Sequence, residues 1–252
     1  MSDSSIRPSR PNYGIDAPEV VSRFLAIGIS GLILGVAGIF LSSRGIVSWT
    51  RFFAVPCLAV GVMFLVQAGV MVWGSRIGKL SLRDKVIRSI PWRGDEVVLD
   101  VGCGHGLMLI GAAKQLRTGK AIGIDLWQAE DQAGNSREAT WQNVELENLN
   151  PRVELRDGDA RRLPFDTNQF DIVLSSWALH NIYDQAGRNM AVREIVRVLR
   201  PGGRLAIIDI RHTSEYARVL EESRMADIRR LGPDFLFVIP TFTLTATKPK
   251  AC

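Results

Sequence analysis

Three glycines at alternate positions follow an acidic residue in the segment Asp100-Val101-Gly102-Cys103-Gly104-His105-Gly106. Because apolar residues lead into this segment, we expect a buried strand that ends near Val101 and a helix that begins near Leu107. Glycine allows a sharp turn and lets a ligand approach bare backbone. A dinucleotide site has the spacing G-x-G-x-x-G, which residue 107, a leucine, does not satisfy. The segment therefore predicts a small-ligand site other than a dinucleotide site at the carboxyl end of a parallel strand.

A second acidic residue, Asp125, ends the short apolar segment Lys120–Asp125. It lies about twenty residues beyond the glycines, where a nucleoside-binding α/β unit places a carboxylate that accepts hydrogen bonds from the ribose hydroxyls. The alternative is a solvated acid at the end of a strand. With the glycines before it, Asp125 is the candidate for ribose binding.

The spacing D-x-G-x-G-x-G resembles the S-adenosylmethionine (SAM) site of class I methyltransferases. Segments at 153–160, 170–176 and 204–209 follow in the order of that family's strands, so the resemblance covers roughly residues 96 to 210. It implies an α/β fold with a Rossmann-like, mostly parallel sheet and an antiparallel last strand, formed here by a terminal hairpin of 229–238 and 241–247. Helical patterns lie at 107–117, 136–149, 185–199 and 214–225, and Asn135 with Glu138 predicts a capping box before the second of these.

The resemblance also implies that SAM is the methyl donor and which residues hold it. In the family, the acidic and small residues after the third strand meet the adenine ring, so Asp159 would accept from its exocyclic amine and the Ala160 N–H would donate to a ring nitrogen. A turn-forming aspartate is the alternative for Asp159. The residues expected to bind the cofactor are Asp100, Gly102, Gly104, Gly106, Asp125, Leu126, Asp159, Ala160 and Ser176.

Candidate catalytic residues follow the fourth expected strand, in the segment 176–184. Methyl transfer from a sulfonium depends on alignment, and it needs a base only when the acceptor must lose a proton. This segment resembles that of the quinone-biosynthesis and related small-molecule methyltransferases (methyltransferase type 11). His180 is the candidate general base and Tyr183 the candidate for orienting the acceptor, whereas Asp184 is expected to cap the next helix. For His180 the alternatives are packing on the cofactor or capping that helix, and His212 is a second, weaker candidate base.

Two long apolar runs precede this domain, at 24–41 and 52–73. At 1.5 Å per residue they would extend roughly 27 and 33 Å as helices, enough to cross a bilayer core. A secretory signal and two buried helices of a soluble core are the alternatives. We therefore expect a short polar tail (1–23), a two-helix transmembrane hairpin (24–73), a basic juxtamembrane helix (74–92) and a methyltransferase domain (93–252).

Basic residues flank the expected hairpin unevenly. Five of them lie between residues 76 and 88, whereas the connecting loop holds only Arg44 and Arg51. The positive-inside rule then places both termini and the catalytic domain in the cytoplasm of a multi-pass membrane protein. The net charge of the chain is +5, and the basic residues beside the expected hairpin fit contact with anionic lipid. Basic residues interleaved with aromatic ones are not found, which counts against a nucleic-acid partner.

Four glycines of the first run, Gly28, Gly31, Gly35 and Gly38, lie at helical three-four spacing. Small residues at this spacing permit close helix contact, either with the second run or with another protomer in a homo-oligomer. The three cysteines and three histidines show no spacing typical of a metal site.

A substrate lid, which many small-molecule methyltransferases carry after the fifth strand, has no room in the link 210–213. The cover over the methyl group must then come from the loop 127–134, the juxtamembrane helix or the bilayer. We therefore expect a site that opens toward the membrane and takes a lipophilic small molecule such as a quinone or isoprenoid phenol. Two alternatives stay open: a phospholipid-headgroup N-methyltransferase with Trp127, Trp177 and Tyr183 around the amine, and a non-catalytic SAM-binding membrane scaffold.

Overall fold

The computed structural model describes residues 10–127, 134–236 and 239–250, which divide into two compact units. Residues 15–78 form one of them, which we call the hairpin unit. The sheet unit consists of the chain before residue 15 together with the chain from residue 79 onward. Each is described by itself below.

The sheet unit is built on seven strands in the order β3-β2-β1-β4-β5-β7-β6. Strands β1 to β5 pair in parallel, and β7 is antiparallel to both β5 and β6. The expected mostly parallel sheet with an antiparallel last strand is thus confirmed. The strands are β1 Val97–Val101, β2 Lys120–Asp125, β3 Val153–Asp157, β4 Phe170–Ser176, β5 Leu199–Asp209, β6 Ala226–Asp234 and β7 Thr241–Thr247.

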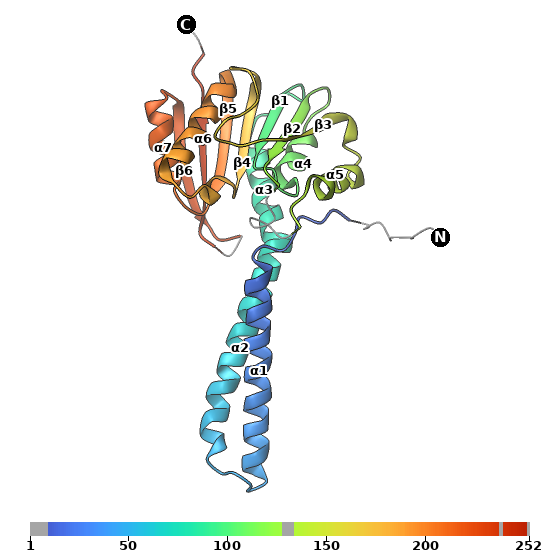
Figure 1. The fold of residues 1–252 in the computed structure, drawn as a ribbon, viewed down its shortest axis with the longest axis vertical. Coiled ribbons are helices and arrows are strands. Elements are labelled where there is room, and N and C mark those ends of the chain that lie inside the picture. The colour runs from blue at the N-terminus through green and yellow to red at the C-terminus, as the bar shows by residue number, and fades with distance from the viewer. Residues whose placement is uncertain (1–9, 128–133, 237–238, 251–252) are drawn as a thin grey trace, which may run out of the picture. The chain divides into compact units, whose positions relative to one another are not determined.

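Helices cover both faces of this sheet (Figure 1). The helices α3 (Lys79–Ser89), α4 (Leu107–Ala113) and α5 (Arg137–Leu146) contribute to one buried cluster, whereas α6 (Gln185–Val198) and α7 (Thr213–Glu222) contribute to the other. Alternate residues of β1 enter the two clusters: Val98 joins the first, and Leu99 and Val101 join the second. This alternation is expected of a strand buried on both faces, and it gives the apolar run that the sequence shows.

Helix α3 belongs to the core of the sheet unit rather than to a separate juxtamembrane segment. Its apolar side chains Leu82, Val86 and Ile87 are buried in the same cluster as α4. A Cβ at Gly111 of α4 would lie 3.2 Å from Ile87, so the two helices approach closely. The expected juxtamembrane segment 74–92 is therefore divided between Gly78 and Lys79, and the sheet unit begins before residue 93.

The cap of α5 also differs from the expected capping box. Ser136 is the N-cap, and its side chain accepts a hydrogen bond from the Ala139 N–H at 3.1 Å. The Asn135 side chain instead donates to Asp125 at 3.3 Å, so it serves the carboxyl end of β2. The cap expected at Asp184 is confirmed, since its carboxylate accepts from the Gly187 N–H at the start of α6.

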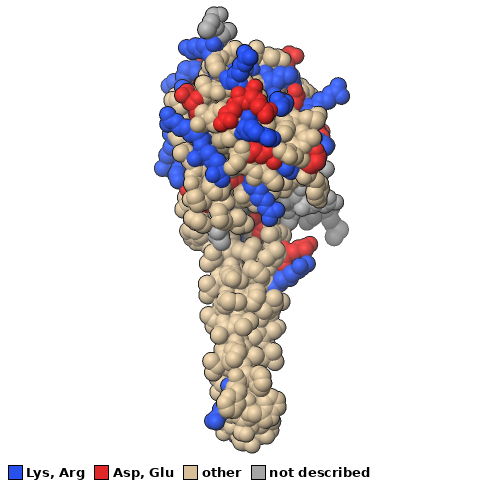
Figure 2. All heavy atoms as spheres, turned by 90° about the vertical axis from the view of Figure 1, so that its left-hand side faces the viewer, with Lys and Arg blue, Asp and Glu red and all other residues tan. Residues whose placement is uncertain are grey.

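The hairpin unit consists of two long helices, α1 (Pro18–Ser43) and α2 (Thr50–Trp73), followed by a π-helical turn at Gly74–Gly78. Both are long and apolar enough to cross a membrane. Figure 2 shows that, on the visible face, charged side chains of this unit lie only near its two ends. Large apolar side chains such as Ile33, Leu34 and Phe52 are more than 60% exposed between those ends.

The glycine stripe of α1 faces α2 of the same chain. A Cβ at Gly31 would lie 2.8 Å from the Cys57 carbonyl oxygen and the Gly61 Cα, and a Cβ at Gly28 would lie 2.7 Å from Leu65. Gly35 and Gly38 face Leu58 and Ala54 in the same way. Of the two contacts expected for this stripe, the structure therefore has the one with the second helix, and a homo-oligomer stays a prediction.

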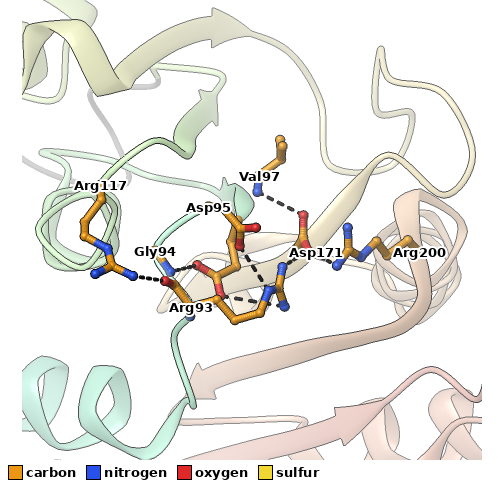
Figure 3. A network of polar contacts seen from close by, with 8 residues as sticks. Arg93, Gly94, Asp95, Val97, Arg117, Asp171 and Arg200 are labelled. Atoms are coloured by element: carbon orange, nitrogen blue, oxygen red, sulfur yellow. Dashed lines mark hydrogen bonds and ion pairs between the residues drawn. The ribbon is translucent and has the colours of Figure 1, made fainter.

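A polar network fixes the edge of the sheet at which β1 and β4 begin (Figure 3). The buried Asp171 accepts from the Arg93 Nη2 at 2.9 Å and from the Val97 N–H at 3.0 Å, and it also pairs with Arg200. Arg117 donates to the Arg93 carbonyl oxygen at 2.8 Å. This network lies at the amino edge of the parallel strands, opposite the edge where the candidate site residues lie.

Candidate active site

The residues that the sequence singled out come together at the carboxyl edge of the parallel strands. In register, Val101 of β1 lies beside Ile124 of β2 and Ser175 of β4, so the connections that follow these three strands start side by side. In open α/β sheets, ligands bind outside the carboxyl ends of the strands where the strand order reverses. Here that point lies between β1 and β4, the strands that the glycine loop (residues 102–106) and the His180 segment follow.

The glycine loop turns away from β1 with positive φ at three residues. Gly102, Gly104 and Gly106 have φ of 71°, 46° and 82°, a region that side-chain-bearing residues rarely adopt. The Gly102 and Cys103 N–H groups donate to the Ile124 carbonyl oxygen at 2.8 and 3.2 Å, which ties the loop to β2. A Cβ at Gly102 would also collide with the Ala178 side chain from the connection after β4. Glycine is therefore needed here for both conformation and space.

Asp125 holds the glycine loop from the end of β2. Its carboxylate is buried and accepts from the Gly104 N–H at 2.8 Å, from the Trp127 N–H at 2.7 Å and from Asn135 at 3.3 Å. Asp125 thus lies at the carboxyl edge and beside the glycine loop, and its role with ribose stays a prediction. It holds this position through backbone donors, which leaves fewer of its lone pairs for ribose hydroxyls.

Three buried polar atoms near this edge have no hydrogen-bond partner among the described residues: Asp100 Oδ1, Asn135 Oδ1 and Ser176 Oγ. Burying such atoms without partners costs free energy, so their gathering near the glycine loop fits a polar ligand. Burial, with the charge of Asp125 nearby, raises the pKa of Asp100 to about 7. A cation bound beside Asp100 would stabilise its charged form. SAM has a sulfonium and an ammonium group, so the residues present fit it.

The connection after β3 is arranged differently from the expectation for adenine. The Asp159 carboxylate accepts from Arg161 Nε and Nη2 at 2.9 and 2.6 Å, and this pairing lowers the pKa of Asp159. An adenine amine would therefore compete with Arg161. The Gly158 N–H donates to the Asp125 carbonyl oxygen at 3.0 Å, which holds this connection against the end of β2. Ala160 is partly buried against the core, and Leu126 is 49% exposed.

His180 forms a close pair with Asp209, which follows from the adjacency of β4 and β5. His180 Nδ1 lies 2.6 Å from Asp209 Oδ1, and the His180 N–H donates to Asp209 Oδ2 at 3.2 Å. Asp209 is fully buried, and the Tyr216 hydroxyl donates to its Oδ2 at 3.3 Å. Burial and the Asp209 charge raise the pKa of Tyr216, so that this hydroxyl keeps its proton. Nδ1 makes no aligned hydrogen bond among the described residues, so Asp209 faces the imidazole as a close carboxylate.

The connection that carries His180 is clamped by a buried cation. Arg188 of α6 donates through Nη1 to the Ile182 and Tyr183 carbonyl oxygens, both at 2.9 Å, and pairs with Glu215 of α7 at 3.1 Å. Its side chain is 7% exposed. The Tyr183 side chain, by contrast, is fully exposed, so the structure gives no support to its expected role with the acceptor. His212 lies 3.6 Å from Glu215 and is more exposed than His180.

Residues 12–14, far from the glycine loop in sequence, also lie at the site, and no sequence pattern predicted this contact. The Asn143 side chain of α5 accepts from the Asn12 N–H at 2.8 Å and donates to the His105 carbonyl oxygen at 3.0 Å. Lys79 donates to the Tyr13 and Gly14 carbonyl oxygens at 2.7 and 2.8 Å. Residues 12–14 are thereby held beside the glycine loop.

Asp209, Asn135 and Asn143 are site residues that sequence reasoning missed. Asp209 ends the fifth expected strand, as Asp100 and Asp125 end earlier ones, so its position was a usable signal. Asn135 was assigned to a helix cap because it precedes a helical pattern. Asn143 lies inside a helix, and nothing in its spacing indicates a contact with the glycine loop. The expected covering loop 127–134 lies for the most part outside the described residues.

Comparison with known proteins agrees with this geometry. Residues 99–207 match the family model of the methyltransferase domain. The chain is 32% identical over 143 residues to 2-phytyl-1,4-beta-naphthoquinone methyltransferase of Arabidopsis thaliana, with 55% of this chain and 52% of that protein covered. It is 35% identical over 128 residues to demethylmenaquinone methyltransferase of Lactiplantibacillus plantarum, with half of each covered. The chain thus spans about half the length of the curated relatives it matches.

The fold is also that of solved methyltransferase structures. A SAM-dependent methyltransferase from Aquifex aeolicus superposes with a TM-score of 0.50 at 22% identity, covering 66% of this chain and 88% of that one. At this identity the likeness shows the fold alone. The sheet order and the glycine loop thus agree with a methyltransferase fold, and residues 99–207 match the family model of the methyltransferase domain.

Proposed function

We propose that this protein is a membrane-anchored methyltransferase that transfers a methyl group from SAM to a lipophilic, quinone-like acceptor at the cytosolic face of a membrane. The observation that carries the proposal is the His180–Asp209 pair in the connection that lies against the glycine loop through Ala178 and Gly102. A base held this close to the cofactor loop suits an acceptor that must lose a proton, such as a ring hydroxyl.

The roles of the residues follow from their contacts. The glycine loop, Asp100, Asp125, Asn135 and Ser176 would hold the cofactor, which supplies an activated methyl group on a good leaving group. His180 Nε2 would accept the acceptor's proton as the new bond to the methyl carbon forms, and Asp209 would stabilise the resulting imidazolium through Nδ1. Arg188 would keep the His180 connection in place through its two carbonyl contacts.

The names of two relatives support a quinone-like acceptor. One is named as a methyltransferase of a phytyl-naphthoquinone and the other as a methyltransferase of demethylmenaquinone. Anchoring in a membrane is supported by α1 and α2, because only 17% and 11% of their most apolar stretches are buried. Helices of a soluble core would be mostly buried, so their exposure favours lipid as the surrounding medium. The uneven flanking charges favour cytoplasmic termini and a cytoplasmic sheet unit.

The other two hypotheses have less support. A phospholipid amine would need an aromatic cage, yet Tyr183 is fully exposed and the Trp127 indole donates to Asp157 at 2.7 Å. A non-catalytic scaffold has no need of a histidine paired with a buried carboxylate, and residues 99–207 match the methyltransferase domain model.

The test is transfer of an isotopically labelled methyl group by the full chain in lipid vesicles. The reaction would contain labelled SAM and either a demethylated naphthoquinol or a phospholipid with a primary amine, followed by mass spectrometry of the lipid extract. We expect label in the quinol and none in the phospholipid, and strong loss of label in His180→Ala with SAM binding retained. Label in the phospholipid alone would establish the alternative acceptor, and label in neither would contradict the proposal.

A further inference from the structure

The carboxyl edge of the sheet unit carries exposed apolar side chains that neither cofactor binding nor proton transfer uses. Phe235 and Ile239, in the connection between β6 and β7, are 61% and 44% exposed. Leu126 after β2 is 49% exposed, and Tyr183 after β4 is fully exposed. We call these four side chains the apolar rim. In the described part of the sheet unit, the other large apolar side chains with comparable exposure are Met190 on α6 and Leu231 on β6.

The first part of the β6–β7 connection is held in place by polar contacts. Asp234 Oδ1 accepts from the Leu236 N–H at 2.9 Å, and Oδ2 pairs with Lys85 of α3 at 2.6 Å. Leu236 packs against the same buried cluster as Trp177 of the connection after β4. Leu236 therefore faces the protein while its neighbour Phe235 faces outward. In its described part, the connection therefore has one side toward the core and an exposed apolar side at Phe235.

The chain enters and leaves the hairpin unit at this same edge of the sheet unit. Residues 12–14 are held by Asn143, which also contacts the glycine loop, and by Lys79 at the start of α3. Only residues 15–17 separate Gly14 from α1, and only the five residues of Gly74–Gly78 separate α2 from Lys79. An extended chain covers about 3.3–3.6 Å per residue, so each link spans at most roughly 20 Å.

We infer that the apolar rim contacts the surface of the lipid bilayer in which the hairpin lies, so that the opening of the active site rests on the membrane. This inference depends on the membrane anchoring in the proposed function. Short links on the rim's own edge favour lipid over a soluble partner, because the chain runs from that edge into the hairpin within a few residues. Phenylalanine, leucine and isoleucine gain by leaving water at such an interface, and tyrosine is suited to its polar region.

The contact has a consequence for the acceptor. A lipophilic molecule could then pass from the bilayer to His180 without its apolar part entering water. The lipid surface would then cover the edge of the active site that a lid after β5 covers in other small-molecule methyltransferases.

The test places a fluorine probe at single sites of the full chain in nanodiscs. 4-Trifluoromethylphenylalanine replaces Phe235 in the rim, Met190 as an exposed site (52%) on α6, or Phe53 as an exposed site (62%) on α2. Fluorine line broadening is then measured with lipids that carry a spin label and, separately, with a water-soluble gadolinium chelate. Neither measurement needs turnover or an identified acceptor.

We expect lipid spin labels to broaden the Phe235 and Phe53 sites several-fold more than the Met190 site, with the opposite order for the soluble chelate. If the Phe53 site responds to lipid and the Phe235 site behaves like Met190, the rim does not contact the membrane while the anchoring stands. A Phe235 site shielded from both agents would show that protein covers the rim, which also overturns the inference. A Phe53 site without lipid broadening would overturn the anchoring itself.

Discussion

His180 Nδ1 lies 2.6 Å from Asp209 Oδ1, although His180 follows β4, Asp209 ends β5 and the two are 29 positions apart. The pair exists because β4 and β5 lie side by side and in parallel, so that both connections start at the same edge. Asp209 is fully buried and is also contacted by the Tyr216 hydroxyl and the Ile210 N–H. The imidazole is therefore held in one orientation by a carboxylate that has no other counter-charge in direct contact among the described residues.

Replacing His180 by alanine should abolish most of the turnover without affecting the cofactor. General bases contribute about 10²–10⁴-fold to rate, and we expect a fall in kcat in that range with the SAM dissociation constant within about twofold of the parent value. Methyl-transfer kinetics and calorimetric SAM titration measure the two quantities. Unchanged kcat would show that the acceptor needs no base and that His180 has a packing role.

Asp209→Asn should reduce kcat less than His180→Ala, because the imidazole stays but loses its orienting charge. Asp171→Asn is the matched control, since it removes a buried carboxylate charge at the amino edge, where Asp171 binds Arg93, Val97 and Arg200. The control should lower the thermal midpoint and leave kcat per folded enzyme unchanged. Equal kcat losses in the two variants would mean that Asp209 acts through stability alone.

SAM binding should strengthen as pH rises through the pKa of Asp100, which burial raises to about 7. Below that pH the Asp100 carboxyl of the folded protein is neutral. A cationic ligand is attracted to the carboxylate only after Asp100 has released its proton. The dissociation constant should therefore fall between about pH 5.5 and 8 and level off above. Calorimetry in buffers of different ionisation enthalpy would detect the released proton, and Asp100→Asn should remove both the release and the slope.

The raised pKa of Asp100 lowers the stability of the ligand-free protein as pH rises. A carboxyl whose pKa rises on folding contributes stability below its unfolded pKa of 3.8, and this contribution is lost as pH rises through about 7. Asp100→Asn should therefore stabilise the ligand-free protein at pH 8 by up to about 4 kcal/mol, and much less at pH 5. A variant that is less stable than the parent at pH 8 would contradict the assigned burial effect.

The fold was predictable because the sequence pattern identifies most of its parallel strands. The runs that end at Val101, Asp125 and Asp209 are mainly apolar, as expected of strands covered on both faces, and glycines or acids mark their ends. The helix ends were less predictable: the pattern that suggested 107–117 ends at Ala113 in the structure. The role of α3 was missed because a basic amphipathic helix next to an apolar run has the same pattern whether it lies on lipid or on α4.

The candidate site was predictable where local sequence determines it and not where the sheet order does. The glycine loop and Asp125 interact at a fixed distance along the chain within one β-α-β unit, so spacing was enough. The His180–Asp209 pair depends on which strands are neighbours, which no local pattern shows. The Asp159–Arg161 pair is local, yet nothing in the sequence distinguishes it from an aspartate left free for adenine.

Gly102→Ala should weaken SAM binding and destabilise the protein, because the new methyl group meets Ala178 and φ is 71°. Gly202→Ala separates these effects: its φ is 80°, but the nearest contact of a Cβ is the flexible Lys250 side chain at 3.5 Å. The control should lose about 1–2 kcal/mol from backbone strain alone and keep its SAM affinity. Adding Ala178→Gly to Gly102→Ala should recover part of the affinity, and a double variant as weak as the single one would locate the damage elsewhere.

Gly61→Ala should loosen the hairpin, because a Cβ there would lie 2.8 Å from the Leu32 nitrogen and 2.9 Å from the Gly28 carbonyl oxygen of α1. These are backbone atoms that cannot move aside, so the two helices must separate, at a cost of about 1–3 kcal/mol. Gly69→Ala on the same helix meets nothing within 4 Å and should be neutral or slightly stabilising. Unfolding of the purified protein in mixed micelles with increasing SDS, followed by circular dichroism, compares the two midpoints. If instead Gly61→Ala leaves the midpoint unchanged but alters the molar mass measured by light scattering, the glycine stripe packs between protomers rather than within the chain.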